Sequence, residues 1–134
     1  MRVTNATDYA VRCLLYMCSR DSGEVVKRRE IAQMMEIPNE FLLRIARRLS
    51  RAGFIEILQG SLGGFRINRK PREINLLDVM EAMEGPLCLS DCVRRERACQ
   101  REGNDCPVHP AWQAATDQLR VTLRKTTFDS LIAA

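Results

Sequence analysis

The hydrophobic period of the chain changes from helical to alternating after Gly53, and this change limits its fold more than any other feature. Before it, apolar residues recur every three or four positions in Arg29–Met35 and in Asn39–Ala52, with a short turn ending in Pro38 between them. After it, the period becomes two on both sides of the glycine-rich segment 59–64. Two short helices around a tight turn, followed by a small hairpin, predict a helix-turn-helix with a wing.

Three more segments show helical spacing of apolar residues, namely Thr7–Ser19, Asn75–Glu84 and Pro110–Lys125. We expect Thr7 or Asp8 to cap the first helix, and Asn75 with Asp78 to cap the second. The third helix is about 24 Å long at 1.5 Å per residue. Its apolar residues form one stripe, which requires a partner: Trp112, Ala115, Leu119 and Leu123.

The predicted fold class is therefore mainly α, with a winged helix-turn-helix head, a small β-hairpin wing and a long C-terminal dimerisation helix. A chain of 134 residues predicts one compact domain. Within it we expect a DNA-binding region at 1–74, a connecting helix with a cysteine-rich loop at 75–109, and the dimerisation helix with the C-terminal segment at 110–134.

Positive charge is concentrated in the first half of the chain. Up to Arg72 there are 14 Lys and Arg against 7 Asp and Glu, and after it 7 against 10, which gives net charges of +7 and −3. This asymmetry predicts that the first half contacts a polyanion and that the second half has another role.

The segment Asn39–Ala52 carries the strongest signal for nucleic-acid binding. At 100° per residue, Arg44, Arg47, Arg48 and Arg51 point away from the apolar face of this helix. A run of charges is usually only a solvated face. Here no acidic residue interleaves with the arginines to form surface pairs, which favours contact with DNA phosphates.

The beginning of this helix and the wing supply candidates for contact with DNA bases. Asn39 can pair with adenine and Glu40 with cytosine, although either could be only a helix cap. The glycine-rich tip lacks the Lys-Ser/Thr pair and the following helix of a phosphate-binding loop, so we interpret it as a wing. The full set of predicted DNA-binding residues is Arg2, Arg28, Asn39, Glu40, Leu43, Arg44, Arg47, Arg48, Arg51, Gln59, Ser61, Gly63 and Gly64.

Residues 86–107 follow neither period and contain four of the six cysteines. The order is Cys88, Cys92, Cys99 and Cys106, and His109 follows, which is not the paired spacing of a zinc ribbon. Thiolates on a long loop suit an iron-sulfur cluster, and neighbouring arginines would offset its negative charge. Spacing leaves zinc open, and the histidine could be only a helix cap. Cys13 and Cys18 lie in a helical pattern, where small buried hydrophobic residues are expected.

Several classes of protein are excluded by the sequence. No apolar run approaches the roughly 18 residues of a membrane span. The polar N-terminus has no export signal, so we expect a cytoplasmic protein in which disulfides are disfavoured. One histidine, no paired nucleophile and no nucleotide fingerprint argue against an enzyme.

The chain resembles the Rrf2 family of bacterial winged-helix regulators, which includes iron-sulfur sensors, over almost its whole length. The resemblance rests on these motifs: Met1-Arg2-Val3-Thr4, Asp8-Tyr9-Ala10, Ile31-Ala32, Leu49 to Gly53, Gly60-x-x-Gly63-Gly64-Phe65, and three spaced cysteines ending in C-x2-H before Trp112. It implies a homodimer that binds a palindromic double-stranded DNA operator. It also implies a [2Fe-2S] or [4Fe-4S] cluster on Cys92, Cys99 and Cys106.

The resemblance leaves the fourth ligand open. In the IscR-like pattern the ligand is the histidine at His109, and in the NsrR-like pattern it is an aspartate of the other subunit, at Asp8. Cys88 is an additional candidate that those members lack. The cysteines are six residues apart where the sensors commonly have five, which leaves the cluster type open. Leu43 and Gln59 replace a Glu and an Arg of IscR-like proteins, so the operator should differ.

The sequence therefore predicts a transcriptional regulator, a repressor in its cluster-bound form, that responds to redox state, nitric oxide or iron. One alternative is a cluster-free regulator of the same fold that uses cysteine thiols or zinc as its switch. Another is a small zinc-binding nucleic-acid protein without a redox role.

Overall fold

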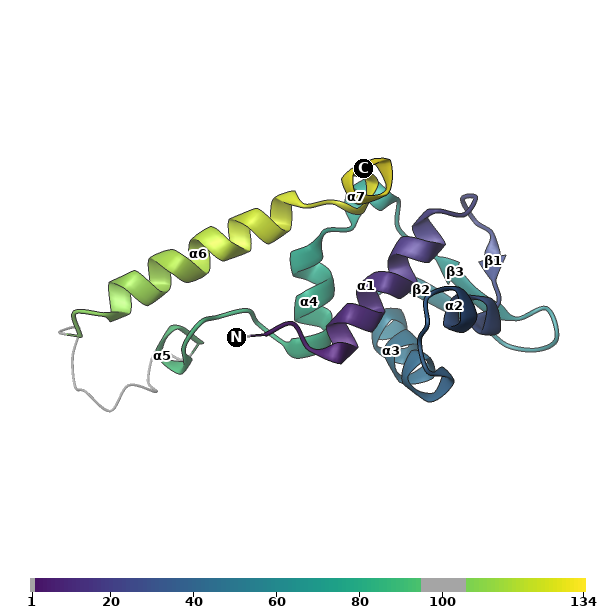
Figure 1. Ribbon diagram of the computed structural model, residues 1–134, viewed down its shortest axis with the longest axis horizontal. Coiled ribbons are helices and arrows are strands. Elements are labelled where there is room, and N and C mark those ends of the chain that lie inside the picture. The colour runs from purple at the N-terminus through teal and green to yellow at the C-terminus, as the bar shows by residue number, and fades with distance from the viewer. Residues whose placement is uncertain (1, 95–105) are drawn as a thin grey trace.

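The computed structural model describes residues 2–94 and 106–134. Helices α1 (Asn5–Cys18), α2 (Arg28–Met34) and α3 (Asn39–Arg51) form a head with a small sheet, as Figure 1 shows. Helix α4 (Leu76–Glu84) stands between this head and the long helix α6 (His109–Lys125). The mainly α fold with a winged head is as predicted from the sequence.

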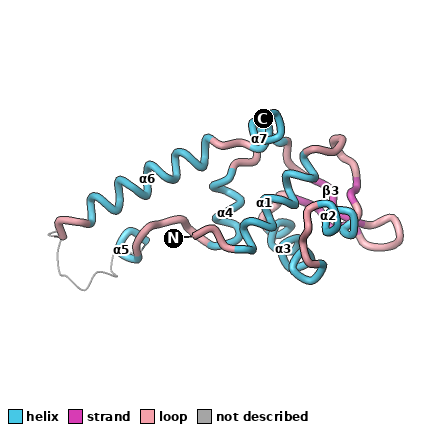
Figure 2. Tube along the Cα trace, in the orientation of Figure 1, coloured by secondary structure: helices cyan, strands magenta, loops and turns pink. Residues whose placement is uncertain are grey.

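The wing hairpin belongs to a three-stranded antiparallel sheet in the order β1-β3-β2. Its strands are magenta in Figure 2. Strands β2 (Ile55–Leu58) and β3 (Gly64–Ile67) form the predicted hairpin, with Ile57 opposite Phe65. Strand β1 (Val25–Val26) pairs with the other edge of β3 and was not predicted, because two residues are too few to show a period.

Helix α1 forms the centre of the hydrophobic core. Its inner face packs on α3 and α4, and Ala10, Cys13 and Leu14 are fully buried. From α3, Leu42 and Leu49 are also fully buried. The prediction that Cys13 and Cys18 are small buried hydrophobic residues is confirmed, since only 0% and 8% of their surfaces are exposed.

Local sequence explains where the helices begin and end. Thr4 caps α1 by accepting a hydrogen bond from the Thr7 amide, so the predicted caps Thr7 and Asp8 are wrong by one turn. Asn75 caps α4 as predicted, through the amide of Asp78. Gly85 ends α4 with φ of +83°, a conformation that favours glycine.

Within the described part of the chain, three short helices were not predicted. They are η1 (Pro71–Glu73), α5 (Asp91–Arg94) and α7 (Phe128–Ala133). Helix α5 lies inside the segment that was expected to be irregular throughout. Helix α7 returns the chain to the head, where Phe128 is fully buried and its amide donates to the Ile74 carbonyl.

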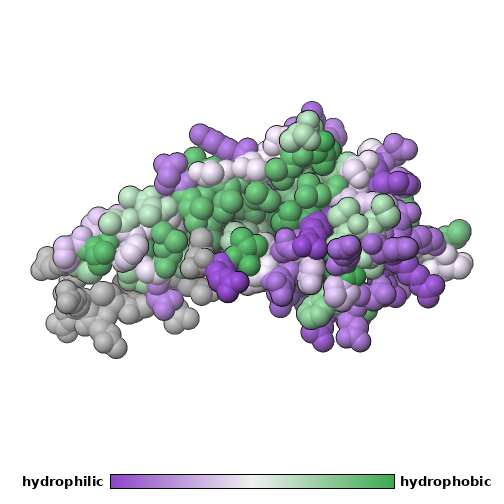
Figure 3. Space-filling model, in the orientation of Figure 1, coloured by the Kyte–Doolittle hydropathy of each residue, from purple (hydrophilic) through white to green (hydrophobic). Residues whose placement is uncertain are grey.

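Helix α6 packs on α4 with only part of its apolar stripe. Leu119 and Leu123 lie against a small cluster of Leu77, Met80 and Leu87. Trp112 and Val121 stay 43% and 38% exposed, and Figure 3 shows apolar side chains along α6. In the part of the chain that is described, no helix is both long and apolar enough to cross a membrane.

Candidate nucleic-acid interface and cysteine site

Helix α3 presents a basic face to solvent. Arg44, Arg47 and Arg51 are exposed, and within residues 2–94 and 106–134 none of them lies at ion-pair distance from a carboxylate. The Arg44 guanidinium lies 5.9 Å from the ring centre of Phe41 on the same helix. Three exposed arginines without acidic partners can neutralise phosphate groups at little cost in broken contacts.

Arg48 differs from these three arginines. Its Nη1 donates a 2.9 Å hydrogen bond to the Met83 carbonyl of α4. The side chain thus leans to the flank of α3 and joins it to a neighbouring helix, although it remains exposed.

The first residues of α3 are available for contact with a ligand. The residue that caps α3 is Pro38, and no side chain makes a cap hydrogen bond there. The interpretation of Asn39 or Glu40 as a helix cap is therefore wrong, and both side chains are exposed. Leu43, one turn further along, is half-buried.

The tip of the wing is a tight turn closed by the Gly63 amide, which donates to the Gly60 carbonyl at 3.0 Å. A Cβ on Gly63 would lie only 2.2 Å from the Leu58 carbonyl oxygen, and one on Gly64 only 2.4 Å from that of Val26. Both glycines are thus required by close backbone approach. Gln59 and Ser61 are exposed beside them.

The remaining two residues in the predicted DNA-binding set, Arg28 and Arg2, lie outside α3 and the wing tip. Arg28 is the first residue of α2 and is exposed. Arg2 lines a cavity of about 340 Å³ together with Cys88 and Ser90. These two residues lie at the beginning of residues 86–107, here called the cysteine segment. Arg2 is therefore placed beside the cysteines.

The structure brings together two residues of the predicted cysteine site. The Sγ atom of Cys92, on α5, lies 3.4 Å from Nδ1 of His109 at the beginning of α6. The Ser90 hydroxyl lies 3.0 Å from the same sulfur. Val108 occupies the cap position of α6 and makes no side-chain cap bond, so the interpretation of His109 as a helix cap is wrong.

Cys106 lies in the turn that leads into α6, where its carbonyl accepts from the His109 amide at 3.3 Å. Cys99 lies outside the described residues. Among the described residues, no three His, Cys, Asp or Glu side chains are grouped closely enough to hold a metal ion. The described donors still fit an iron-sulfur cluster in chemistry, because a thiol and an imidazole from both ends of the segment face each other.

Asp8, the other candidate for a fourth ligand, is engaged elsewhere in this chain. Its carboxylate lies 2.8 Å from the guanidinium of Arg12, one turn along α1. Arg12 also donates to the Met35 carbonyl at 3.3 Å. Asp8 thus belongs to the α1 surface next to the helix-turn-helix.

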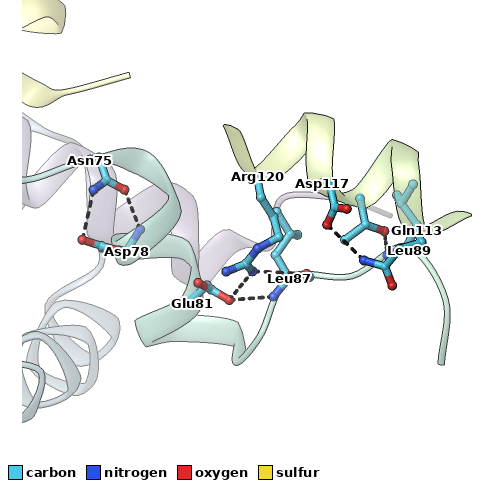
Figure 4. Close-up of polar contacts among 9 residues, drawn as sticks. Asn75, Asp78, Glu81, Leu87, Leu89, Gln113, Asp117 and Arg120 are labelled. Carbon is cyan, nitrogen blue, oxygen red and sulfur yellow. Dashed lines mark hydrogen bonds and ion pairs between the residues drawn. The ribbon is translucent and has the colours of Figure 1, made fainter. Parts of the chain in front are cut away.

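Polar contacts join the cysteine segment to both α4 and α6. Figure 4 shows Glu81 and Arg120 pointing toward each other, with an N–O distance of 2.8 Å. Glu81 also accepts a hydrogen bond from the Leu87 amide at 2.9 Å. Further along, the Leu89 amide donates to the Thr116 hydroxyl, which is 2% exposed. The segment before Cys92 is therefore fixed to two helices.

Besides Arg12, sequence reasoning missed three basic residues with structural roles near these sites. Lys27 donates from Nζ to the Ser61 carbonyl at 2.6 Å and so supports the wing tip. Arg69 donates to the Ala52 carbonyl at 2.7 Å and stacks on Phe54 with a centroid distance of 4.0 Å. Arg120 forms the ion pair described above. Their partners are distant in sequence, so no periodic pattern could have identified them.

A helix-turn-helix followed by a β-hairpin wing, with a basic exposed face on its second helix, defines a winged-helix DNA-binding protein. The chain matches the Rrf2 family, described as "Iron-dependent Transcriptional regulator", over residues 3–134. It therefore belongs to the Rrf2 family, whose members are DNA-binding transcriptional regulators and not enzymes.

Individual relatives agree with this assignment. The HTH-type transcriptional regulator NsrR of Bacillus licheniformis is 30% identical over 110 residues, which cover 82% of this chain and 73% of that protein. CymR of B. subtilis, the "Global Cysteine Regulator", has a similar structure with a TM-score of 0.80 at 18% identity, covering 99% of this chain and 97% of CymR. IscR of T. potens gives 0.77 at 16% identity, covering 99% and 87%. At these identities the two structures show a shared fold.

Proposed function

We propose that this transcriptional regulator senses redox state, nitric oxide or iron through an iron-sulfur cluster. Its ligands would be Cys92, Cys99 and Cys106, with His109, Asp8 of the partner subunit or Cys88 as the fourth. The observation that carries the proposal is the 3.4 Å approach of Cys92 Sγ and His109 Nδ1 from opposite ends of the cysteine segment. When bound, a [2Fe-2S] or [4Fe-4S] cluster supplies a centre that oxidants and nitric oxide attack.

The DNA contacts in this proposal come from α3 and the wing. Arg44, Arg47 and Arg51 contact phosphates, since they are exposed and have no acidic partners among the described residues. Asn39 and Glu40 reach base edges from the first turn, because neither side chain is used as a cap. Leu43 and Gln59 contribute to the operator sequence that is read, with Arg28, Ser61, Gly63 and Gly64 at the edge of the interface.

A homodimer on a palindromic operator, in the cytoplasm, completes the proposal. The support is the exposed apolar part of α6, where Trp112 and Val121 remain 43% and 38% exposed. A second copy that covered this face would place two heads on one duplex, as two-fold symmetry requires of palindromic half-sites.

The polar contacts of residues 86–92 provide a route between the cysteine site and the head. Glu81 and Arg120 hold the Leu87 backbone, and Arg48 joins the end of the same helix α4 to α3. Loss of the cluster shifts operator affinity only if the cluster binds more tightly to one of two arrangements of the head than to the other. We expect repression by the cluster-bound form.

The test is the visible absorption spectrum of protein purified without oxygen, with iron and acid-labile sulfide counted on the same sample. The proposal expects a brown protein with matched iron and sulfide, and their amounts per chain would give the cluster type. Colourless protein that contains neither, even after attempted reconstitution, would contradict the cluster.

One observation favours a second candidate, a cluster-free regulator of the same fold that switches through its thiols or zinc. The sulfur of Cys92 has two hydrogen-bonding neighbours, Ser90 and His109, which also suit a regulatory thiol. Zinc without sulfide, or reversible oxidation of Cys92 that changes DNA affinity, would support this alternative.

A further inference from the structure

The hydrogen bond between Arg48 and Met83 lies at a place where helix chemistry favours a cation. Met83 is the last residue but one of α4, and a helix leaves its final carbonyls without partners inside the helix. The last turn of α4 contains no basic residue of its own. Arg48 supplies the missing positive charge from α3, through a 2.9 Å bond to the Met83 oxygen.

The direction of the Arg48 side chain separates it from the other basic residues of α3. At 100° per residue, it points roughly 70° away from the mean direction of Arg44, Arg47 and Arg51. This places it on the side of α3 that faces α4, and its bond to Met83 agrees with that placement. The guanidinium that best fits an interhelical role is therefore the one least directed toward a DNA surface.

A second guanidinium holds the C-terminal end of α3. Arg69, which follows β3, donates to the Ala52 carbonyl at the end of α3 and stacks on Phe54. Helix α3 is thus fixed to the wing at its end and to α4 along its flank, and both contacts are charge-assisted hydrogen bonds.

The end of α4 that binds Arg48 is also where the cysteine segment begins. Glu84, next to Met83, accepts a hydrogen bond from the Thr4 amide, and Glu81 accepts one from the Leu87 amide. Arg48 therefore bonds α3 to the same end of α4 at which these contacts meet.

We propose that Arg48 is a positioning residue, which sets the pose of α3 by binding the end of α4 and does not itself neutralise a DNA phosphate. This inference rests on the proposed DNA-binding role of α3 and identifies which of its arginines acts indirectly. Removing Arg48 then weakens DNA binding because α3 loses its hydrogen bond to the end of α4, and the number of counterions released from DNA stays the same.

The test measures the dissociation constant across a series of salt concentrations. The probe is the duplex that the full-length protein itself selects from a random-sequence duplex library. We expect Arg47→Met and Arg51→Met each to flatten the slope of log Kd against log salt by about one per subunit. Arg48→Met should weaken binding by about tenfold and leave the slope unchanged. Arg48→Lys, which keeps a donor for the Met83 carbonyl, should recover part of the affinity.

The possible outcomes distinguish failure of the positioning role of Arg48 from failure of the DNA-binding role of α3. A slope change for Arg48→Met equal to that for Arg47→Met, or no loss of affinity, would overturn the positioning role and leave the DNA-binding face standing. Unchanged slopes for Arg47→Met and Arg51→Met, or failure to select any duplex, would overturn the DNA-binding face and with it the role of Arg48. Thermal unfolding of each variant shows whether a loss of affinity reflects a loss of the folded state. If Arg48→Met does not fold, the affinity and salt slope of Arg48→Lys test the positioning role instead.

Discussion

Glu81 and Arg120 join the helix before the cysteine segment to the helix after it, with 2.8 Å between Oε2 and Nη1. The same two side chains hold the Leu87 backbone, since Glu81 accepts from its amide and Arg120 donates to its carbonyl. Both side chains are about three-quarters buried. One ion pair thus fixes the geometry in which the cysteine segment leaves the head.

The ion pair should make stability depend on pH in the acid range. Burial by itself raises the pKa of Glu81, but hydrogen bonds from Arg120 and Leu87 and the charges of Arg120 and Arg124 lower it below its ordinary value. The pair therefore contributes its full stability above the pKa of an unfolded glutamate and loses it as pH falls through the lower folded pKa. We expect Glu81→Gln to lower the free energy of unfolding by about 1 kcal/mol at neutral pH.

Urea unfolding at neutral pH and near pH 3 measures this difference. The gap between the wild type and Glu81→Gln should shrink at the acid pH, because the unfolded wild-type carboxylate is then largely protonated and must lose that proton to form the ion pair. Asp21→Asn, in an exposed turn, is the control and should show no such gap. An equal gap at both pH values would be inconsistent with the ion pair as its source.

The two buried cysteines of α1 should resist thiol-modifying reagents that react with cysteines of the cysteine segment. Burial raises the pKa of Cys13 to about 12 and that of Cys18 to about 11. Since the thiolate is the reactive form, both should stay unmodified by iodoacetamide in the folded protein, and Cys88 and Cys92 should react when no cofactor is bound. Mass spectrometry of peptides from folded and denatured samples checks this, and early labelling of Cys13 in folded protein would contradict it.

The raised pKa values of Cys13 and Cys18 predict that the folded protein loses stability at alkaline pH. Their folded pKa values lie above the ordinary value, so their contribution is complete below that value and declines as pH rises toward 11 to 12. Cys13→Ala should lower stability at neutral pH through the cavity it leaves. Its stability should then decline less than that of the wild type between pH 9 and 11, as measured by urea unfolding.

The local elements were predictable from the sequence, whereas their long-range contacts were not. The helical period of Asn39–Ala52 and the alternation around the glycine-rich tip gave the helix-turn-helix and its wing within about a residue. The same periodicity grouped Arg48 with Arg44, Arg47 and Arg51 and could not show its hydrogen bond to Met83, because a helical wheel carries no information on where α4 lies. The 3.4 Å approach of Cys92 and His109 also depends on tertiary packing. Helix α5 was missed because one turn is too short for a period.

The wing tip should be sensitive to the replacement of a single glycine by alanine. In Gly63→Ala the new Cβ would lie 2.2 Å from the Leu58 carbonyl, so the turn must open. We expect a loss of about 1–3 kcal/mol in the free energy of unfolding and a larger loss of DNA affinity than that cost explains. Gly23→Ala is the comparison variant, because its φ of +80° makes alanine unfavourable by backbone strain alone, since its Cβ would meet nothing within 4 Å. Equal DNA affinities for the two variants would argue against a role of the wing.

The candidates for a fourth cluster ligand can be separated by single substitutions. His109 Nδ1 lies beside Cys92, whereas Asp8 is paired with Arg12. We therefore expect His109→Ala to lose bound iron and visible absorption, as Cys92→Ala should, and Asp8→Asn to keep both. Loss in Asp8→Asn alone would favour a ligand from the partner subunit. Intact spectra in both variants would favour Cys88.

The exposed part of α6 should determine whether the protein dimerises. Trp112 is 43% exposed and Ala115 is exposed one turn further along, whereas Leu119 and Leu123 of the same stripe pack on the cluster of Leu77, Met80 and Leu87. A glutamate at position 115 would place a charge in any interface formed by the exposed part without touching the α4 contact.

We expect Ala115→Glu to yield a folded monomer, seen as a halved mass in sedimentation, with an unchanged circular dichroism spectrum. Affinity for a two-half-site duplex should fall sharply, because binding of the two heads is no longer linked. Asp117→Lys changes a charge at an exposed position that is already charged, and it should remain a dimer. A dimeric Ala115→Glu would show that this stretch of α6 lies outside the interface, and a monomeric wild type would remove the dimer altogether.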